Sequence, residues 1–222
     1  QRPFKFFAEA YYKKLDFLIP YEIDNVRIRY YATNNSKGYA TGIDLRVNGE
    51  FIKGTESWAS MSVMKVAENI SNDSIVRSDG SVKYPGNIPR PTDQRVNFSV
   101  FFQDELRKNP KYKMHLMGVF GTGLPFGPPN KHIYNNRQRV PPYRRVDIGF
   151  SKMIIDEKMN ETDRKGLSKL FHSAWISLEV FNLLQINNTI SYLWIKDITN
   201  TYYAVPNYLT SRRLNVALMI KF

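Results

Sequence analysis

Residues 212–222 alternate strictly with a period of two, which constrains the fold more than any other segment. Leu214, Val216, Leu218, Ile220 and Phe222 would share one face of an extended strand, because successive side chains of a strand point to opposite faces. A strand that crosses a bilayer at a tilt needs about nine to eleven residues. The segment is therefore compatible with a soluble sheet or a membrane β-barrel. Its aromatic end favours the barrel, since the ends of soluble domains usually fray.

The amino-acid composition excludes several other architectures. Aromatic residues make up 14% of the 222-residue chain, with 14 Tyr and 14 Phe, and these types are enriched in strands. The chain has no cysteine, so disulfide bonds, thiol catalysis and thiolate metal sites are excluded. No apolar run approaches the roughly 18 residues of a membrane helix, whereas in a barrel strand only every second residue faces lipid.

The chain is strongly basic, with 32 Lys and Arg against 20 Asp and Glu and a net charge of +12. A basic protein can bind nucleic acid, but here the basic residues are scattered along the chain and form no recognisable nucleic-acid-binding module. We expect them on loops and on the polar faces of strands, and we expect no nucleic-acid partner.

Alternating segments like the terminal one recur along the whole chain. About ten strands are expected, at approximately residues 4–13, 26–33, 39–51, 58–68, 95–103, 112–120, 145–151, 174–181, 190–198 and 212–222. No segment has a convincing amphipathic helical pattern. The sequence therefore predicts an all-β, antiparallel fold.

Two kinds of connection join the expected strands. Short turns are expected near residues 52–56, 105–110 and 184–188, and long loops containing Gly and Pro near 71–94 and 121–142. Short turns at one end of the strands and long loops at the other are typical of membrane barrels.

Motifs in several parts of the chain carry more information than the periodicity. They are Y-K-K-L and K-G-Y-A-T-G-I-D within residues 4–68, R-P-T-D-Q-R at 90–95, G-T-G-L-P-F-G-P-P at 121–129, Y-R-R-V-D-I-G-F at 143–150 and V-F-N-L-L at 180–184. Together with the terminal strand, they resemble the barrel of TonB-dependent outer-membrane receptors, in the branch with carboxypeptidase-like N-terminal extensions. Leu184 replaces the family's usual Phe, and Ser211 stands where the family often has Gly.

The resemblance implies an antiparallel transmembrane β-barrel segment in the bacterial outer membrane. Residues 1–222 would be the C-terminal part, with about ten strands of a 22-stranded barrel. The plug and the first strands would lie upstream, because the chain begins directly on a strand without a signal peptide. Such a segment alone would form an open, curved sheet.

The resemblance also implies a function and a set of partners. The function would be active uptake of a scarce nutrient, energised by TonB through the plug region. Membrane lipid, lipopolysaccharide and a surface lipoprotein are further expected partners. The outer-membrane assembly machinery would recognise the last strand, with Leu214, Val216, Leu218, Ile220 and Phe222 as its signal. We expect no cofactor and no enzymatic activity.

Two other classes of protein share much of this pattern. A passive porin or structural barrel would close its sheet with these strands and need no plug. A soluble β-sandwich would also show the alternation. Within the barrel reading, counting strands back from the C-terminus places the turn at 184–188 and the long loop at 121–142 on the periplasmic side. For the loop at 121–142, that position conflicts with its length, because the periplasmic connections of membrane barrels are usually short.

Candidate catalytic and metal-binding residues are few. His115, His132 and His172 are far apart and lack the spacing of metal ligands. The acidic pairs at 104–105 and 156–157 adjoin turns, where a solvated role needs no special chemistry.

Ligand contacts would come from aromatic and charged side chains on loops near the mouth of a lumen. The substrate-binding candidates are Tyr84, Arg90, His132, Tyr134, Arg137, Tyr202 and Tyr203. The sequence does not distinguish among siderophore, cobalamin, glycan, peptide and metal chelate as the ligand.

Overall fold

A computed structural model describes residues 4–52, 55–106, 109–127, 138–156 and 171–221 of the chain. These residues form strands, turns and loops without a helix, and the strands pair antiparallel. The predicted all-β, antiparallel fold is therefore confirmed.

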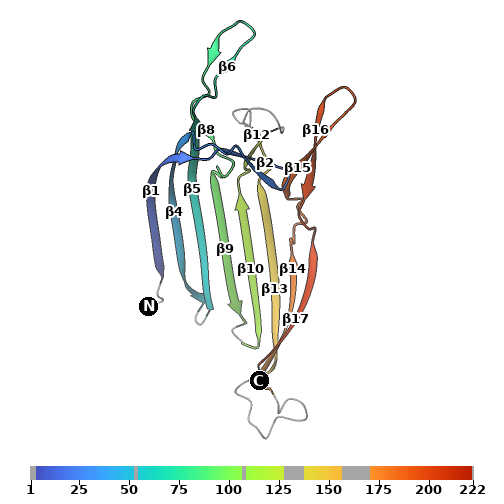
Figure 1. Cartoon of the computed structure of the whole chain (residues 1–222). Helices are drawn as coiled ribbons and strands as arrows, with labels where there is room; N and C mark the ends of the chain where they lie inside the picture. The colour runs from blue at the N-terminus through green and yellow to red at the C-terminus, as the bar shows by residue number, and fades with distance from the viewer. Residues whose placement is uncertain (1–3, 53–54, 107–108, 128–137, 157–170, 222) are drawn as a thin grey trace.

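Eight strands form one open, twisted wall (Figure 1). In order across the sheet they are β1 (Lys5–Leu18), β4 (Ser36–Ile52), β5 (Thr55–Ile70), β9 (Val96–Glu105), β10 (Tyr112–Gly121), β13 (Tyr143–Ile155), β14 (Ser173–Phe181) and β17 (Arg213–Lys221). A ninth, short strand, β8 (Ile88–Pro89), pairs with one end of β5. The sheet is not closed into a barrel.

The register between strands keeps the alternation in phase across the whole wall. One row of directly paired residues runs Phe6, Val47, Ala59, Val100, Gly118 and Val146. A second row runs Leu116, Ile148, Val180 and Leu214. The register shifts only near strand ends, at 15–18, at 49–52 and at 153–155, so the middle of the sheet keeps one apolar face.

The apolar face is open to its surroundings instead of forming a core. Phe6 is 72% exposed, Phe150 52% and Leu214 68%. Apart from glycine and proline, the buried apolar residues of the described chain are Ala67, Ile88 and Ala174. No second sheet packs over the wall in the described ranges, so they do not form the two-layer β-sandwich that was one alternative.

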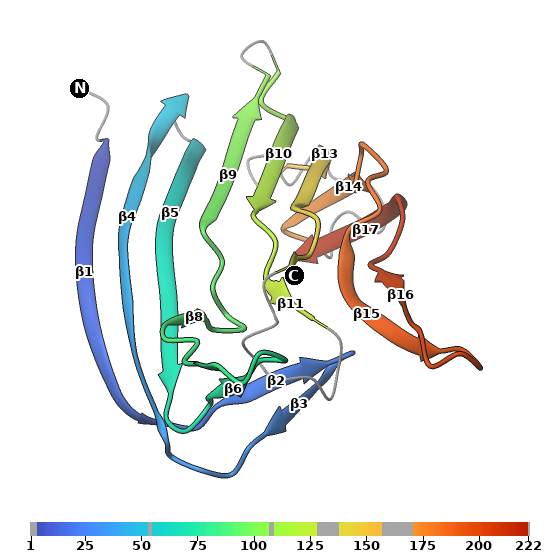
Figure 2. The ribbon, with the colours of Figure 1, turned by 90° about the horizontal axis from the view of Figure 1, so that it is seen from above.

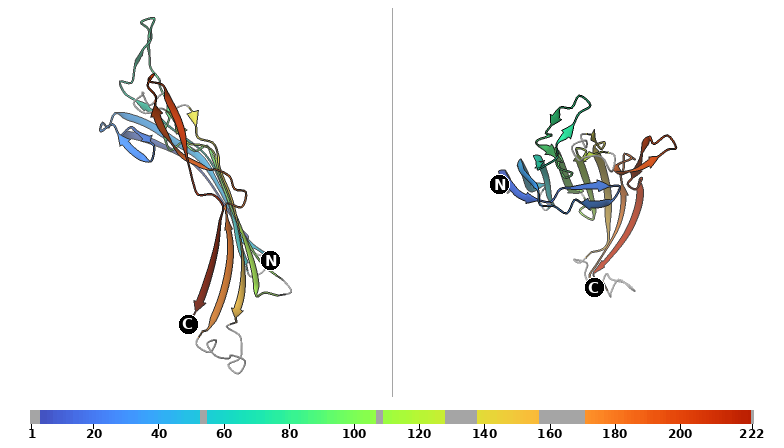
Figure 3. Two further views of the ribbon diagram at one scale, coloured as in Figure 1. Left: turned by 90° about the vertical axis from the view of Figure 1, so that its right-hand side faces the viewer. Right: turned by 45° about the horizontal axis from the view of Figure 1, so that its top comes forward.

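The two ends of the wall differ (Figures 1 and 3). One end carries four connections with hairpins: β2 (Tyr21–Asp24) with β3 (Arg27–Tyr30), β6 (Ile75–Val76) with β7 (Val82–Lys83), β11 (Pro125–Phe126) with β12 (Gln138–Arg139), and β15 (Thr189–Lys196) with β16 (Tyr202–Tyr208). We call this end the mouth. The opposite end carries the start of β1, the end of β17 and the connections from β4 to β5, β9 to β10 and β13 to β14.

Two of the about ten expected strands do not belong to the wall. The expected strand at 26–33 is the short β3, which pairs with β2, and the expected strand at 190–198 is β15, which pairs with β16. β14 instead pairs directly with β17. Alternation reports the period of a strand but not its partner, so the sequence could not separate hairpin strands from wall strands.

This correction also resolves the position of the long loop at 121–142. Residues 182–212 form a single excursion from the mouth, so the turn at 184–188 does not lie at the C-terminal end of the wall as expected. The connection from β10 to β13 lies at the mouth with it (Figure 1). The described residues of both segments therefore lie at the end of the wall away from the end of β17.

Two asparagines hold the excursion against β13. Asn182 has a left-handed φ of 52°, and its N–H donates to Asp147 Oδ1 at 2.8 Å. Asn188 Nδ2 donates to the Arg144 carbonyl at 2.9 Å, and the Arg144 N–H donates to Asn188 Oδ1 at 2.8 Å. The side-chain amide of Asn188 therefore replaces a strand partner at the end of β13.

We predict that Asn188→Ala lowers the free energy of unfolding by about 1–3 kcal/mol, because it leaves backbone groups of Arg144 without their partner. Asn187→Ala is the matched control, since Asn187 is exposed and should change stability by less than about 0.5 kcal/mol. Denaturant unfolding of the intact purified protein measures both. Equal effects of the two substitutions would contradict this role of Asn188.

Candidate functional site

The four connections at the mouth converge on one pocket. The β2–β3 hairpin extends from the β1 side of the wall toward β15 (Figure 2). At its tip, Asn25 Oδ1 accepts hydrogen bonds from Ser191 Oγ at 3.0 Å and from Asn207 Nδ2 at 2.8 Å. Asn25 has a φ of 58°, a conformation that asparagine tolerates better than most residues. The hairpin therefore bridges connections that are far apart in the sequence.

The pocket behind this bridge, which we call the mouth pocket, has a volume of about 260 Å³. Its lining comes from the β2–β3 hairpin, from the connection between β10 and β13, from the β15–β16 excursion and from Gln94. Phe126 stacks on Tyr192 with ring centroids 4.6 Å apart and an interplanar angle of 14°. The Trp194 ring is 6.1 Å from Phe126. One side of the pocket is therefore lined by aromatic rings.

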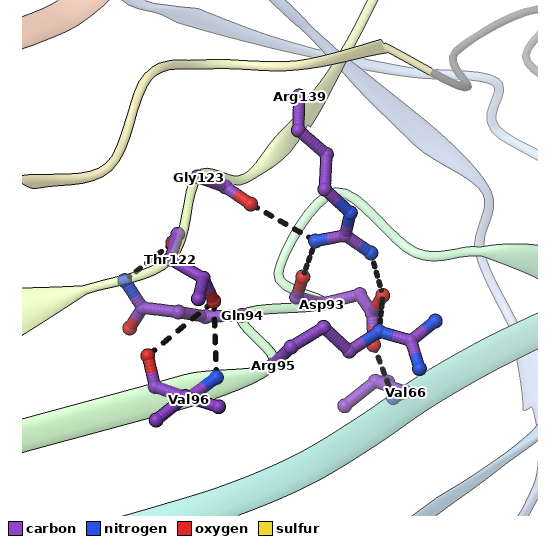
Figure 4. Close-up of polar contacts among 8 residues, drawn as sticks. All are labelled: Val66, Asp93, Gln94, Arg95, Val96, Thr122, Gly123 and Arg139. Atoms are coloured by element: carbon purple, nitrogen blue, oxygen red, sulfur yellow. Dashed lines mark hydrogen bonds and ion pairs between the residues drawn. The ribbon is translucent and has the colours of Figure 1, made fainter.

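A buried carboxylate anchors the mouth to the wall (Figure 4). Asp93 is fully buried, and its Oδ1 accepts the Val66 N–H of β5 at 2.7 Å. Its Oδ2 accepts from Arg95 Nε at 2.7 Å and also from Arg139 Nη2. Arg139 Nη1 donates to the carbonyls of Asp93 and Gly123, at 2.6 and 2.9 Å. Arg139 thus ties the connection between β10 and β13 to the connection between β5 and β9.

The floor of the mouth pocket is built by backbone-directed contacts next to this anchor (Figure 4). Gln94 Nε2 donates to the Thr122 carbonyl at 3.1 Å, and Thr122 Oγ1 accepts the Val96 N–H at 3.0 Å. A Cβ on Gly123 would overlap the Val140 carbonyl. Only glycine allows the two segments to approach this closely.

The tip of the β15–β16 hairpin is held by Asp197. Its Oδ1 accepts from Thr199 Oγ1 at 2.7 Å and from the N–H groups of Thr199 and Thr201 at 2.8 and 2.9 Å. These hydrogen bonds, that from the Thr199 side chain first, lower the pKa of Asp197 below its usual value. The carboxylate therefore stays charged and fixes the turn of the hairpin that carries Tyr192 and Trp194.

The polar face of the wall carries a continuous row of interacting side chains. Arg46 lies 5.9 Å from the Trp58 ring, Trp58 stacks on Phe101 at 6.2 Å, and Phe101 stacks on His115 at 6.1 Å. His115 Nε2 lies 3.7 Å from Glu179 Oε1, and Asn215 Nδ2 donates to Glu179 Oε2 at 2.9 Å. Gly149 lies between β10 and β14 under the His115 ring, where a Cβ would clash with it. The missing side chain is what lets His115 reach Glu179.

The predicted ligand residues that the structure describes lie outside the mouth pocket. Arg90 contacts Glu68 Oε2 at 3.8 Å, the Ile19 carbonyl at 3.5 Å and the Tyr21 ring at 5.2 Å, so it joins segments at the rim. Tyr84 is exposed beside the β6–β7 hairpin. Tyr202 and Tyr203 begin β16, where Lys196 Nζ lies 5.5 Å from the Tyr202 ring.

The remaining predicted residues divide between the described and the undescribed parts of the chain. His132, Tyr134 and Arg137, together with Phe222 of the assembly signal, lie outside the described residues. Leu214, Val216, Leu218 and Ile220 lie on the apolar face of β17, as their alternation predicts.

The aromatic residues of the mouth pocket were not predicted. Tyr192 and Trp194 share one face of a strand at i and i+2, but this strand was predicted to belong to the wall. Phe126 lies in the motif at 121–129, where glycine and proline indicate a loop and not a binding surface. Their shared location depends on two distant segments and has no local sequence signal.

Among the residues that the structure describes, no group of three or more His, Cys, Asp or Glu side chains could hold a metal ion. Over the same residues, no helix is long and apolar enough to cross a membrane.

Comparison of the chain with protein-family models, curated proteins and solved structures finds no match. The resemblance to TonB-dependent receptors therefore rests on the sequence motifs and stays a prediction.

We predict that Arg139→Ala destabilises the protein by about 3–5 kcal/mol, because it removes one of the two charges paired with the buried Asp93 and two hydrogen bonds to backbone carbonyls. Arg95→Ala is the matched control. Arg95 is 42% exposed and makes a single contact with Asp93 and none with the connection between β10 and β13, so its loss should destabilise the protein less than the loss of Arg139. Denaturant unfolding compares the two variants. A larger effect of Arg95→Ala would show that Arg139 is not the anchor.

Proposed function

We propose that this chain is the C-terminal wall of a TonB-dependent transporter in the bacterial outer membrane, which takes up a scarce nutrient. The observation that carries the proposal is the exposed apolar face, which runs in register across all eight wall strands. Such a face is unfavourable in water and favourable in hydrocarbon.

The size of this face supports a lipid environment. Eight strands about 4.8 Å apart, each with roughly 20 Å of alternating apolar residues, give a footprint on the order of 700 Å². The largest apolar patch on a typical soluble monomer has about 300–600 Å² of accessible area. Side chains that protrude from the sheet expose more area than the footprint alone, so the wall exceeds this range.

The open edges support a larger barrel. The outer edges of β1 and β17 have no strand partner among the described residues. Unpaired backbone groups are too costly in a bilayer, so further strands must cover both edges. This requirement fits the proposed 22-stranded barrel, of which the chain would supply eight strands.

The connections support one orientation in the membrane. The mouth, with its four long connections, would face outward, and the end of β17 would face the periplasm. Two of the three connections at that end are short, at 53–54 and 106–111, while the connection at 156–172 is longer than the rule predicts.

The polar face and the mouth favour a transporter with a restricted entrance over a porin with an open channel. In a closed barrel, the row from Arg46 to Asn215 would face the lumen, and the bridged connections would narrow the entrance. TonB would act through the plug region, lipid and lipopolysaccharide would surround the wall, and the assembly machinery would recognise β17. A surface lipoprotein could cover the mouth.

Two measurements on the intact protein, which under this proposal includes the plug region, test it against a passive porin. In planar lipid bilayers, we expect no large, steady conductance, because a plugged transporter is closed at rest. We also expect the purified protein to retain the periplasmic domain of TonB. A steady open-pore conductance without TonB binding would replace the proposal with the porin alternative.

A charge on each face of β17 tests the membrane environment. Leu218 and Met219 are adjacent, point to opposite faces, and are 61% and 72% exposed. We predict that Leu218→Arg destabilises the protein in lipid by about 2–4 kcal/mol, because it places a charge in hydrocarbon. Met219→Arg, the matched control opposite Trp175, should cost much less.

Unfolding of both variants in lipid vesicles measures this difference. In a water-soluble sheet, the two exposed positions would tolerate arginine equally. Equal stability of the two variants would therefore remove the membrane proposal.

A further inference from the structure

The mouth pocket differs from the rest of the protein in its charge. The chain has a net charge of +12, yet no Lys, Arg, Asp or Glu lines this pocket in the described part of the chain. The lining combines apolar side chains with Asn, Gln, Thr, Ser and Tyr. Two basic residues that adjoin the lining in sequence are engaged elsewhere, since Arg139 and Arg95 both bind the Asp93 carboxylate.

The polar groups at the pocket are largely used within the protein. Asn25 Oδ1 accepts from Ser191 and Asn207, and Gln94 Nε2 donates to the Thr122 carbonyl. Gln94 Oε1 accepts from Asn97, and Thr122 Oγ1 is paired with Val96. A charged ligand would lose its hydration here without gaining a counter-charge from the described lining residues, which is strongly unfavourable.

The aromatic rings that line the pocket supply the attractive interaction with a ligand. Tyr192 and Phe126 are nearly parallel, and Trp194 is tilted by 34° against Phe126. A flat ring can join such a group by offset stacking or by edge-to-face contact, worth about 0.5–1.5 kcal/mol per pair beyond the buried area. Leu124, Ile190 and Leu209 add apolar contacts around the rings.

We propose that the mouth pocket binds a small, uncharged molecule that presents a flat aromatic ring. Its volume of about 260 Å³ is just below the usual range for pockets of drug-sized ligands, about 300–1,000 Å³, which suits one or two rings. That the bound molecule is captured for uptake rests on the proposed function.

The test uses the intact purified protein and three probes of nearly equal size. They are 4-hydroxybenzyl alcohol, which is uncharged and aromatic, 4-hydroxybenzoate, which is anionic, and 4-(hydroxymethyl)cyclohexanol, which is saturated. Titration calorimetry measures their affinities. We expect the aromatic alcohol to bind at least tenfold more tightly than the other two. Binding of 4-hydroxybenzoate with equal or higher affinity would overturn the proposal.

Substitutions locate the binding to the pocket. Tyr192→Ala should weaken binding of the aromatic alcohol at least tenfold. Leu193→Ala is the matched control, because Leu193 is the next residue of β15 and does not line the pocket. Unchanged binding in a folded Tyr192→Ala variant would overturn the proposal.

A gain-of-function variant keeps the test valid if Tyr192→Ala does not fold. Ile190 lines the pocket and is 55% exposed, so Ile190→Lys can add a positive charge without disturbing a core. We expect this variant to bind 4-hydroxybenzoate at least tenfold more tightly than the parent protein does. No gain in a folded variant counts against the pocket as the binding site.

The binding assay needs neither TonB nor a membrane potential. Selective probe binding by a protein that fails to bind TonB would support the pocket and contradict the transporter. The reverse result would contradict the pocket alone.

Discussion

The backbone register between neighbouring strands is the constraint on which the rest of this structure depends. A shift of one residue between any two wall strands would move every side chain of one strand to the other face. The register instead keeps Phe6, Val47, Ala59, Val100, Gly118 and Val146 in one row. Since the shifts occur near strand ends, the eight strands act as a single two-faced sheet.

The same register distributes polar and apolar groups in a way that differs from a globular domain. Apolar side chains such as Phe6 and Leu214 are exposed, whereas Glu68, Asp93 and Ser57 are buried. The buried polar groups lie mainly where connections meet the strands, and Asp93 has partners from three segments. The strands thus provide the extended surface, and the buried ionic contacts provide local order at the mouth.

The mouth holds the specific side-chain contacts that join distant segments of this chain. The Asn25 bridge, the Asp93 anchor and the paired amide of Asn188 each join segments that are distant in the sequence. The described residues that line the pocket between these contacts are uncharged. A strongly basic protein therefore contains an apolar, aromatic site next to its most highly charged anchor.

Most of the wall could be predicted from the sequence, because the two-residue period of a strand is a local property. Strands β4, β10 and β17 lie close to their expected ranges. Partner choice is not local, so the segments at 26–33 and 190–198 were placed in the wall although they form hairpins at the mouth. Likewise, the loop residues Arg90, Tyr202 and Tyr203 were predicted ligand contacts, but they do not line the mouth pocket.

The alternation of apolar and polar residues was enough to establish a two-faced antiparallel sheet and the residues on each face. The number of wall strands, the end at which each loop lies and the residues of the mouth pocket depended on the folded chain. These features arise from contacts such as Phe126 with Tyr192 and Arg139 with Asp93, which join residues 66 and 46 positions apart. No periodicity within one segment encodes a contact of that range.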